Sequence, residues 1–444
     1  MALSDCNTPM LNPLRITLDT GSESCINRYP PTCEWRESVC ISIRRLQHRE
    51  AIPETRMKHG VALVGPPLAI CIGLFATGAP ISRSIIRIAL YLMKFLGFFR
   101  LARQITRHGL RIICYHGFAV AEEYKYRSTL FIRGDFFRKR VEYLKRERYP
   151  ILPLRDALDA LAAGRLPPCA TVITMDDGWR GVHTVGLPII RELEIPVTVY
   201  VTTYYVENPM PVFTVTVSYL FWRATPQLVH LPRGIGTFDL ECEAAKAEEA
   251  AQNFGAALPP GDRLEFLKEL AAALDISFYD IESQHLFEVM DEQQLRDLAA
   301  AGVDIQLHSH RHQWPLYDRE MVESEIAENR RFLQRAVSYP LEHFCYPSGV
   351  YGLHQAEWLA ELGVKSATTI DPGLNYSHTS RFALRRLVDG GPVSDIEFAA
   401  EMTGFMELVR LLRRRLRAAR DMTARWRVYR DKGRPSSTPT ESRP

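Results

Sequence analysis

The chain has 444 residues, of which 46% are hydrophobic and 24% are charged. This composition is that of an ordinary globular protein, and the length allows one large α/β domain plus accessory segments. The formal net charge of +3 gives no overall attraction to a polyanion, so we expect no nucleic-acid partner. The nine cysteines include no Cys-x-x-Cys pair, which excludes a zinc ribbon of the usual spacing.

The N-terminal region divides into two segments of different character. Residues 1–60 lack clear periodicity, so we expect a disordered or non-native extension. Residues 61–107 are first apolar and then basic and amphipathic, which suits contact with a membrane surface. The uncharged run at 61–81 contains Pro66 and Pro67, and three interpretations stay open: a secretion signal, a membrane anchor and an artefact of an upstream start.

Residues 108–400 alternate short apolar runs with amphipathic helical patterns, and we expect one domain there. The predicted strands are residues 110–114, 171–175, 197–201, 303–307 and 343–346. The predicted helices are residues 135–146, 157–163, 187–193, 291–301, 321–336 and 353–362. This alternation predicts a parallel, barrel-like sheet with helices outside it.

An insertion at about residues 203–290 interrupts this alternation. Its first part is rich in aromatic residues and its second part is rich in alanine and glutamate, with helices predicted at 244–252 and 264–274. Three roles stay open for its aromatic side chains: a lid, a lipid-facing patch and the core of the insertion itself. These side chains are Tyr204, Tyr205, Phe213, Tyr219, Phe221 and Trp222.

The C-terminal segment, residues 401–444, combines many arginines with leucines at helical spacing. This pattern predicts a basic amphipathic helix followed by a disordered tail. Such a helix is either a solvated surface helix or a site of membrane contact.

Polar side chains that suit catalysis follow three of the predicted strands. They are His116, the pair Asp176 and Asp177, and the pair His308 and His312. Active sites of α/β barrels are built at this end of the strands. Adjacent aspartates cannot share one face of a strand, so one can bind a metal while the other remains a base. Two histidines and one carboxylate with an open position form a catalytic zinc arrangement, although each pattern alone is also common in turns and polar helices.

These residues resemble the motifs of the polysaccharide deacetylase family, the NodB-like carbohydrate esterases. Thr-Met-Asp-Asp-Gly at 174–178 is similar to the first motif, Thr-Phe-Asp-Asp-Gly. His-Ser-His-Arg-His at 308–312 is similar to the second motif, and residues 344–349 occupy the place of the third. The resemblance covers residues 111–387. The strand that ends in Tyr115-His116, near the start of the domain, resembles the first strand of the poly-N-acetylglucosamine deacetylase branch.

The resemblance implies a distorted (β/α)7 barrel with a mainly helical insertion. It also implies a divalent metal bound by Asp177, His308 and His312, with zinc as the default and cobalt or nickel as alternatives. Asp176 would be the general base for a water that attacks the acetyl carbonyl, and the backbone N–H of Ser348 would complete an oxyanion hole.

The general acid is expected to be His116. Many family members take this acid from a histidine near the end of the domain, but no histidine follows His378 in this chain. The poly-N-acetylglucosamine deacetylase branch carries the equivalent histidine at the end of the first strand. A core histidine bonded to a backbone carbonyl remains the alternative.

The third motif departs from the common Arg-x-Pro-Tyr pattern. Cys-Tyr-Pro-Ser at 345–348 lacks both the arginine that orients the catalytic aspartate and the tyrosine that lines the pocket. We expect Arg386 to replace that arginine from the final strand, with a surface arginine as the alternative. His310 is expected to point away from the metal, and Trp179, Trp314 and Tyr317 either stack on a sugar or pack against the domain.

The predicted function is metal-dependent removal of N-acetyl groups from an N-acetylhexosamine-containing polysaccharide or glycoconjugate. Two alternatives stay open: a non-catalytic carbohydrate-binding protein on the same fold, and an amidohydrolase acting on a small non-sugar amide. For such a substrate we favour the cell envelope or a membrane-associated location, with the cytoplasm as the alternative.

Overall fold

The computed structural model describes residues 82–432, with side chains described up to residue 418. The predictions for 1–60, for 61–81 and for the last twelve residues therefore lie outside the described residues. The described part begins with the helices α3 (Arg83–Phe95) and α4 (Phe98–Ile105) and ends with α17 (Asp395–Met402) and α18 (Phe405–Lys432).

The centre of the domain is a parallel sheet of seven strands in the order β10-β9-β8-β5-β4-β1-β11. The strands are β1 (Arg111–Tyr115), β4 (Thr171–Met175), β5 (Thr198–Val201), β8 (Asp304–Leu307), β9 (His343–Cys345), β10 (Ser366–Thr368) and β11 (Leu387–Val388). Every residue of β1, β4, β5 and β9 is buried, as expected for a parallel sheet covered by helices on its outside.

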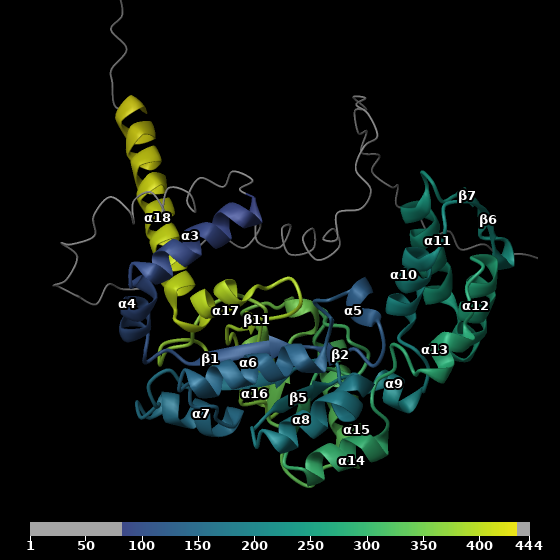
Figure 1. The fold of residues 1–444 in the computed structure, drawn as a ribbon, viewed down its shortest axis with the longest axis horizontal. Coiled ribbons are helices and arrows are strands. Elements are labelled where there is room, and N and C mark those ends of the chain that lie inside the picture. Colours follow the sequence, from purple (N-terminus) through teal and green to yellow (C-terminus); the bar gives the residue numbers. More distant parts are fainter. Residues whose placement is uncertain (1–81, 433–444) are drawn as a thin grey trace, which may run out of the picture. The chain divides into compact units, whose positions relative to one another are not determined.

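The segment before β11 curls the sheet into a barrel. The backbone N–H of Leu384 donates to the carbonyl of Ala367 in β10, whereas the N–H of Asp389 donates to the carbonyl of Cys114 in β1. One short stretch of chain thus bonds to β10, at one end of the sheet, and to β1, the neighbour of the end strand β11 on the opposite side. The predicted (β/α)7 barrel is confirmed, and Figure 1 shows the helices around it.

The helices around the barrel agree with the predicted ones to within three residues at each end. They are α6 (Gly134–Arg146), α7 (Leu154–Ala162), α8 (Leu187–Glu192), α14 (Glu292–Ala300), α15 (Arg319–Leu333) and α16 (Gln355–Glu361). Asp291 begins α14 through a capping box with Gln294, and Gly302 follows its end with a φ of 82° that favours glycine. Local side-chain chemistry therefore sets both ends of this helix.

Several short elements were not predicted. They are β2 (Gly117–Phe118), α5 (Glu123–Tyr126), β3 (Phe131–Ile132), a π-helical turn (Val182–Gly186), the 3₁₀ turn Pro347–Gly349 and β10. Segments of two to five residues are too short for hydrophobic periodicity to show, so only tertiary contacts define them.

The insertion packs around a hydrophobic core of its own. Its elements are α9 (Tyr204–Glu207), α10 (Phe213–Arg223), the hairpin β6 (Leu228–Leu231) and β7 (Gly236–Asp239) with a 3₁₀ turn (Pro232–Gly234), α11 (Ala244–Ala257), α12 (Pro260–Ala273) and α13 (Tyr279–Ser283). Phe213 and Phe221 are buried there together with Phe266, whereas Trp222 is half exposed. For Phe213 and Phe221, core packing is therefore what the structure shows.

The helices at the two ends of the described chain form a separate small core. Met93 of α3, Phe99 of α4, Ile396 of α17 and Phe405 of α18 are buried together, with 5.2 Å between the ring centroids of Phe99 and Phe405. Figure 1 shows α3, α4, α17 and α18 on the same side of the barrel. Within residues 82–432, no helix is both long and apolar enough to span a bilayer.

Candidate metal centre and active site

Asp177, His308 and His312 meet at the carboxyl end of the sheet. Asp177 follows β4 and His308 follows β8, and these strands lie on either side of β5. The Oδ1 atom of Asp177 lies 3.1 Å from Nε2 of His308 and 3.3 Å from Nε2 of His312. Asp177 and His308 are buried, while the His312 side chain is about one third exposed.

The hydrogen bonds of His308 show that this cluster fits a cation. Its Nδ1 lies 2.8 Å from the carbonyl oxygen of Cys345, which can only accept, so Nδ1 carries the proton. In the neutral ring, Nε2 then presents its lone pair to an oxygen of Asp177, and the two repel unless a cation lies between them. Ligand atoms about 2.0 to 2.1 Å from a tetrahedral zinc ion are roughly 3.3 Å apart, which matches the observed spacing. The residues therefore fit a divalent metal with three protein ligands.

The electrostatics of the cluster agree with this assignment. Burial alone would raise the pKa of Asp177, but His308 and His312 hold it well below its usual range. Burial alone would lower the pKa of His308, but Cys345 and Asp177 raise it well above its usual range. The protein thus favours a positive charge between Asp177 and His308, supplied by either a proton or a metal ion.

The backbone around the cluster adopts conformations that non-glycine residues avoid. The φ angle is 71° at Asp177, 59° at Ser309, 57° at His312 and 55° at Ser348. Each such residue costs on the order of 1 kcal/mol or more, and such strain gathers at functional sites. Next to Asp177, Gly178 has a φ of 83° and a Cβ there would lie 2.9 Å from Val201, so this position requires glycine.

Asp176 is bound by Arg386 in a bidentate ion pair. Its Oδ1 and Oδ2 atoms each accept a hydrogen bond of 2.7 Å from the guanidinium. Burial alone would raise the pKa of Asp176, but Arg386 lowers it to about 2, so the carboxylate is ionised at neutral pH. Arg386 is fully buried, which rules out the surface-arginine alternative. Arg386 thus supplies to Asp176 the guanidinium that the altered third motif lacks.

Two cysteines also contact Asp176, and the sequence did not single them out. The Sγ atoms of Cys114 and Cys345 lie 3.5 Å and 3.4 Å from Oδ2 of Asp176. Burial raises the pKa of the Cys114 thiol well above its usual range, so this thiol is protonated and donates. A signal was present in the sequence, because Cys114 is two residues before His116 on the same face of a strand.

The proposed acid and the proposed oxyanion donor follow β1 and β9, two strands that are not neighbours in the sheet. His116 follows β1 and is partly exposed. One ring nitrogen, the Cys114 sulfur and an Asp176 carboxylate oxygen all lie within 4.8 Å of one another. Ser348 is exposed in the turn that follows β9, three residues after Cys345. His116 therefore faces Asp176, and Ser348 follows the strand whose carbonyl orients His308.

The flanking aromatic residues differ in their surroundings. Trp179 is buried and its Nε1 donates to Oδ2 of Asp177 at 2.8 Å, so it holds the carboxylate instead of offering a surface to a sugar. Trp314 is buried against Phe344, with 4.6 Å between the ring centroids. Tyr317 is 85% exposed and is the one of the three that remains open to stacking.

His310 points away from the metal cluster. Its Nδ1 lies 2.9 Å from Oγ1 of Thr203, and its Nε2 lies 3.3 Å from a carboxylate oxygen of Glu328. The adjacent histidines His308 and His312 face Asp177 instead. This orientation agrees with the exclusion of His310 from the metal ligands.

Asn329 of α15 supports the position of His308 and was missed from the sequence. Its Oδ1 accepts the backbone N–H of His308 at 3.0 Å, while its Nδ2 donates to the carbonyl of Val201 at 2.9 Å. Asn329 is fully buried on a helix face that also buries Val322 and Ile326. A polar residue on an apolar helical stripe was the available signal.

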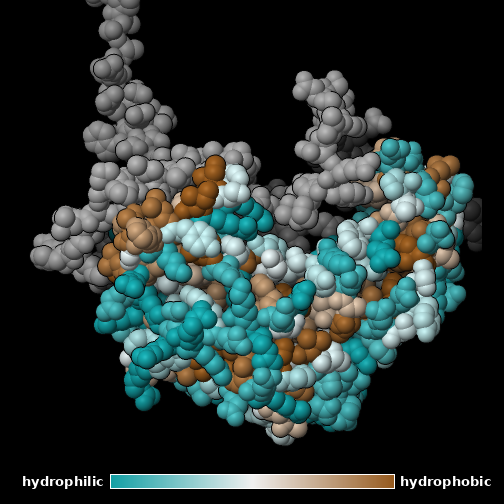
Figure 2. Space-filling view, viewed as in Figure 1, coloured by the Kyte–Doolittle hydropathy of each residue, from teal (hydrophilic) through white to brown (hydrophobic). Residues whose placement is uncertain are grey.

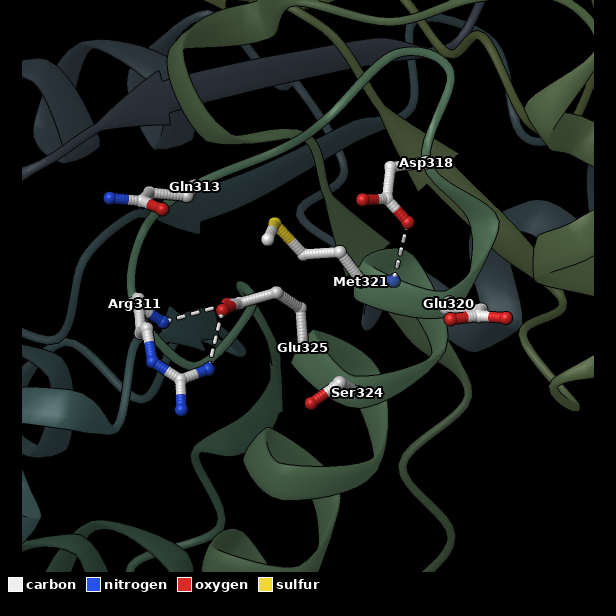
Figure 3. Close-up of a pocket in the computed structure, with 7 residues that line it drawn as sticks. All are labelled: Arg311, Gln313, Asp318, Glu320, Met321, Ser324 and Glu325. Atoms are coloured by element: carbon white, nitrogen blue, oxygen red, sulfur yellow. Dashed lines mark hydrogen bonds and ion pairs between the residues drawn. The ribbon is translucent and has the colours of Figure 1, made fainter. Parts of the chain in front are cut away.

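A surface pocket of about 330 Å³ lies beside the second motif but does not contain the metal ligands. Figure 3 shows its lining, in which the backbone N–H of Arg311 donates to Glu325 at 2.7 Å. The guanidinium of Arg311 also pairs with Glu325 at 2.9 Å. This pocket is open and lined mostly by charged side chains. The contacts between Arg311 and Glu325 within it hold the loop that carries His312.

At its mouth, the barrel presents a carboxylate and two imidazoles to a cation, next to a second carboxylate. This arrangement is typical of a hydrolase with a metal site. Residues 163–367 match the sequence model of the polysaccharide deacetylase family. This segment of the chain is therefore a polysaccharide deacetylase domain.

Several solved structures are similar to the chain at low identity. Deacetylase PplD from Streptococcus pyogenes, solved with acetate, is 17% identical with a TM-score of 0.45, covering 66% of this chain and 98% of that chain. IcaB from Ammonifex degensii is 18% identical with a TM-score of 0.44, covering 66% and 97%. The deacetylase domain of BpsB from Bordetella bronchiseptica is 16% identical with a TM-score of 0.38, covering 62% and 94%. No curated protein matches the chain.

Proposed function

We propose that the chain removes N-acetyl groups from N-acetylhexosamine units of a polysaccharide or glycoconjugate of the cell envelope. The observation that carries this proposal is the different surroundings of two adjacent carboxylates. Asp177 faces Nε2 of His308 and His312, whereas Asp176 is bound by Arg386. One carboxylate is thus suited to bind a metal and the other to accept a proton.

The residues around the cluster divide the reaction among them. A divalent metal held by Asp177, His308 and His312, zinc by default, would supply a Lewis acid and lower the pKa of water. Asp176, ionised and oriented by Arg386, accepts a proton from the water that adds to the acetyl carbonyl. The backbone N–H of Ser348 donates to the carbonyl oxygen as negative charge develops there.

His116 completes the reaction at the leaving group. When the carbon–nitrogen bond breaks, the amine takes the electron pair and requires a proton. The position of His116 beside Asp176, partly open to solvent, suits it to donate that proton. The products are acetate and a free amino sugar.

The geometry argues against a non-catalytic binding protein on this fold. That alternative depended on the arginine missing from the third motif. Because Arg386 contacts Asp176 through two hydrogen bonds of 2.7 Å, the carboxylate keeps the ion pair that the motif would otherwise have supplied. We therefore favour an enzyme.

The proposed substrate class is tested by measuring acetate release from three kinds of substrate. These are oligomers of N-acetylglucosamine, poly-N-acetylglucosamine and a small non-sugar acetamide, each assayed before and after chelation and after return of zinc. We expect release from a saccharide, loss on chelation and recovery with zinc, with Asp176→Asn as the background control. Release from the small amide alone would refute the saccharide substrate, and no metal-dependent release from any substrate would contradict the enzyme.

A further inference from the structure

Helix α3 has two apolar faces, although only one of them is covered. Leu90 and Met93 are buried in the core of the terminal helices. On the other side of the same helix, Ile88 is 68% exposed and Phe95 is 87% exposed. A surface helix of a globular protein normally has a single apolar stripe facing its core. The second stripe therefore requires an explanation outside the fold.

The exposed apolar side chains are concentrated on these two helices. Eight of the seventeen large hydrophobic residues exposed in the described part of the chain lie within residues 83–105, so their clustering is not the usual scatter of single residues. They are Ile85, Ile88, Tyr91, Leu92, Phe95, Leu96, Leu101 and Ile105, which we call the apolar patch. Figure 2 shows hydrophobic surface gathered where Figure 1 places α3 and α4.

The charged side chains on α3, α4 and the residues just after α4 have one sign. Residues 83–107 contain six basic residues and no acidic residue: Arg83, Arg87, Lys94, Arg100, Arg103 and Arg107. Arg83, Arg87 and Lys94 are spaced to form one stripe along α3. On the neighbouring helix α18, Arg414, Arg415 and Arg417 are exposed as well. Only Arg87 of the six forms an ion pair with a described acidic residue, Glu397 at 3.2 Å.

This combination selects among the partners that could cover the patch. A second copy of the chain docking through the same patch would bring the same cations face to face, which is unfavourable. An interfacial helix on an anionic membrane instead places apolar side chains at the acyl boundary and basic side chains among phosphate headgroups. Apolar area and positive charge both favour the lipid surface.

We propose that α3 and α4 bind the surface of a bilayer containing anionic lipids. The helices lie in the plane of the interface, with the apolar patch inserted and the basic residues contacting headgroup phosphates. This proposal rests on the helices alone and does not depend on the activity of the barrel.

The test is co-sedimentation of the full chain with vesicles of phosphatidylcholine, with and without phosphatidylglycerol. We expect binding to the anionic vesicles that weakens with added salt and is at least tenfold weaker for pure phosphatidylcholine. The double variant Ile88→Ser with Phe95→Ser should weaken binding at least tenfold. The double variant Lys94→Gln with Arg100→Gln should weaken binding to the anionic vesicles and leave binding to phosphatidylcholine unchanged.

A matched control is available in the insertion, where Leu228 is 66% exposed and Tyr279 is 73% exposed. Leu228→Ser with Tyr279→Ser should bind vesicles as the wild type does. Circular dichroism and thermal unfolding check that all variants are folded. Failure of the wild type to bind, or equal binding by the Ile88 and Phe95 variant, would overturn the proposal. Self-association of the wild type that this variant abolishes, without vesicle binding, would identify a second copy as the partner instead.

Discussion

The mouth of the barrel and the terminal helices depart from ordinary burial in opposite directions. At the mouth, Asp176, Arg386 and His308 are buried although they carry charge or can gain it. On α3, Ile88 and Phe95 are exposed although they are apolar. A buried charge is tolerated only where partner groups are placed for it, whereas an exposed apolar side chain costs the folded state little free energy.

Each departure indicates a different kind of function. The charged groups at the mouth have partners within the chain: Asp176 pairs with Arg386, and Asp177 contacts His308. These contacts hold the side chains in a defined geometry, as a catalytic site requires. The apolar patch is matched by nothing in the described chain, which indicates a partner outside it. Four predictions test this contrast.

The largest effect is expected at His116. His116→Gln removes the group that protonates the leaving amine, so turnover of an N-acetyl substrate should fall about 10²- to 10⁴-fold while metal content is unchanged. An aryl acetate ester with a good leaving group needs no such proton and should lose much less activity. Equal losses on amide and ester would contradict the role of His116 as an acid.

The next effect concerns the cost of an unmatched buried charge. Arg386→Met leaves the Asp176 carboxylate buried without its partner, and we expect the free energy of unfolding to fall by about 3 to 5 kcal/mol. Adding Asp176→Asn should restore much of this loss, because the remaining charge is then removed. Denaturant unfolding of the three variants provides the measurement.

A surface pair with similar contacts is the control for Arg386. Arg138 makes two hydrogen bonds of 2.6 Å to Glu192, whose side chain is 60% exposed. Arg138→Met should reduce the free energy of unfolding far less than Arg386→Met, because solvent screens this surface pair. Equal losses for Arg138→Met and Arg386→Met would show that burial does not set the energy of the Asp176 pair.

His343 provides a buried titratable group in the barrel, outside the proposed active site. Burial, together with Arg155, lowers the pKa of His343 to about 4. The unfolded chain, with an ordinary value near 6.5, binds the proton first, so stability should fall as the pH drops from about 6.5 to about 4 and change no further below that. The size is on the order of 3 kcal/mol. His343→Asn should remove this part of the pH dependence, and an unchanged slope would refute the prediction.

The smallest effect is expected on the exposed face of α3. Ile88→Ser should change the free energy of unfolding by less than about 0.5 kcal/mol, because the side chain gains nothing from the fold. Leu90, two residues away, is 1% exposed, and Leu90→Ser should cost about 2 to 5 kcal/mol. A loss at Ile88 similar to that at Leu90 would mean that the patch belongs to the core.

Most of the barrel could be predicted from the sequence because its strands are continuous apolar runs between amphipathic helices. The predicted strand at 171–175 matches β4, and the predicted helix at 291–301 extends α14 by one residue at each end. A final strand was expected near Arg386, but its bounds could not be predicted, because β11 has only two residues and its pairing with β1 is decided by the curvature of the whole sheet. The insertion was located by the break in alternation, while its hairpin was not predicted.

The cluster was predictable where its residues directly follow predicted strands. The positions of Asp177, His308 and His312 after predicted strands indicated the cluster. The absence of an arginine from the third motif led to the prediction that Arg386 replaces it. Cys114 and Asn329 were missed because their roles come from contacts across the barrel. Trp179 was placed beside the site, but its hydrogen bond to Asp177 was not predicted. The alternation of Cys114 and His116 on one strand face was a signal, but it did not show which group the cysteine contacts.

The division of labour between the adjacent aspartates is the central claim, and metal content measured beside acetate release tests it most directly. Wild type should carry one zinc per chain and release acetate. Asp176→Asn should keep the metal and lose acetate release, whereas His308→Ala should lose both. Loss of the metal from Asp176→Asn, or a full metal content in His308→Ala, would contradict the assignment of Asp177, His308 and His312 as the ligands and Asp176 as the base.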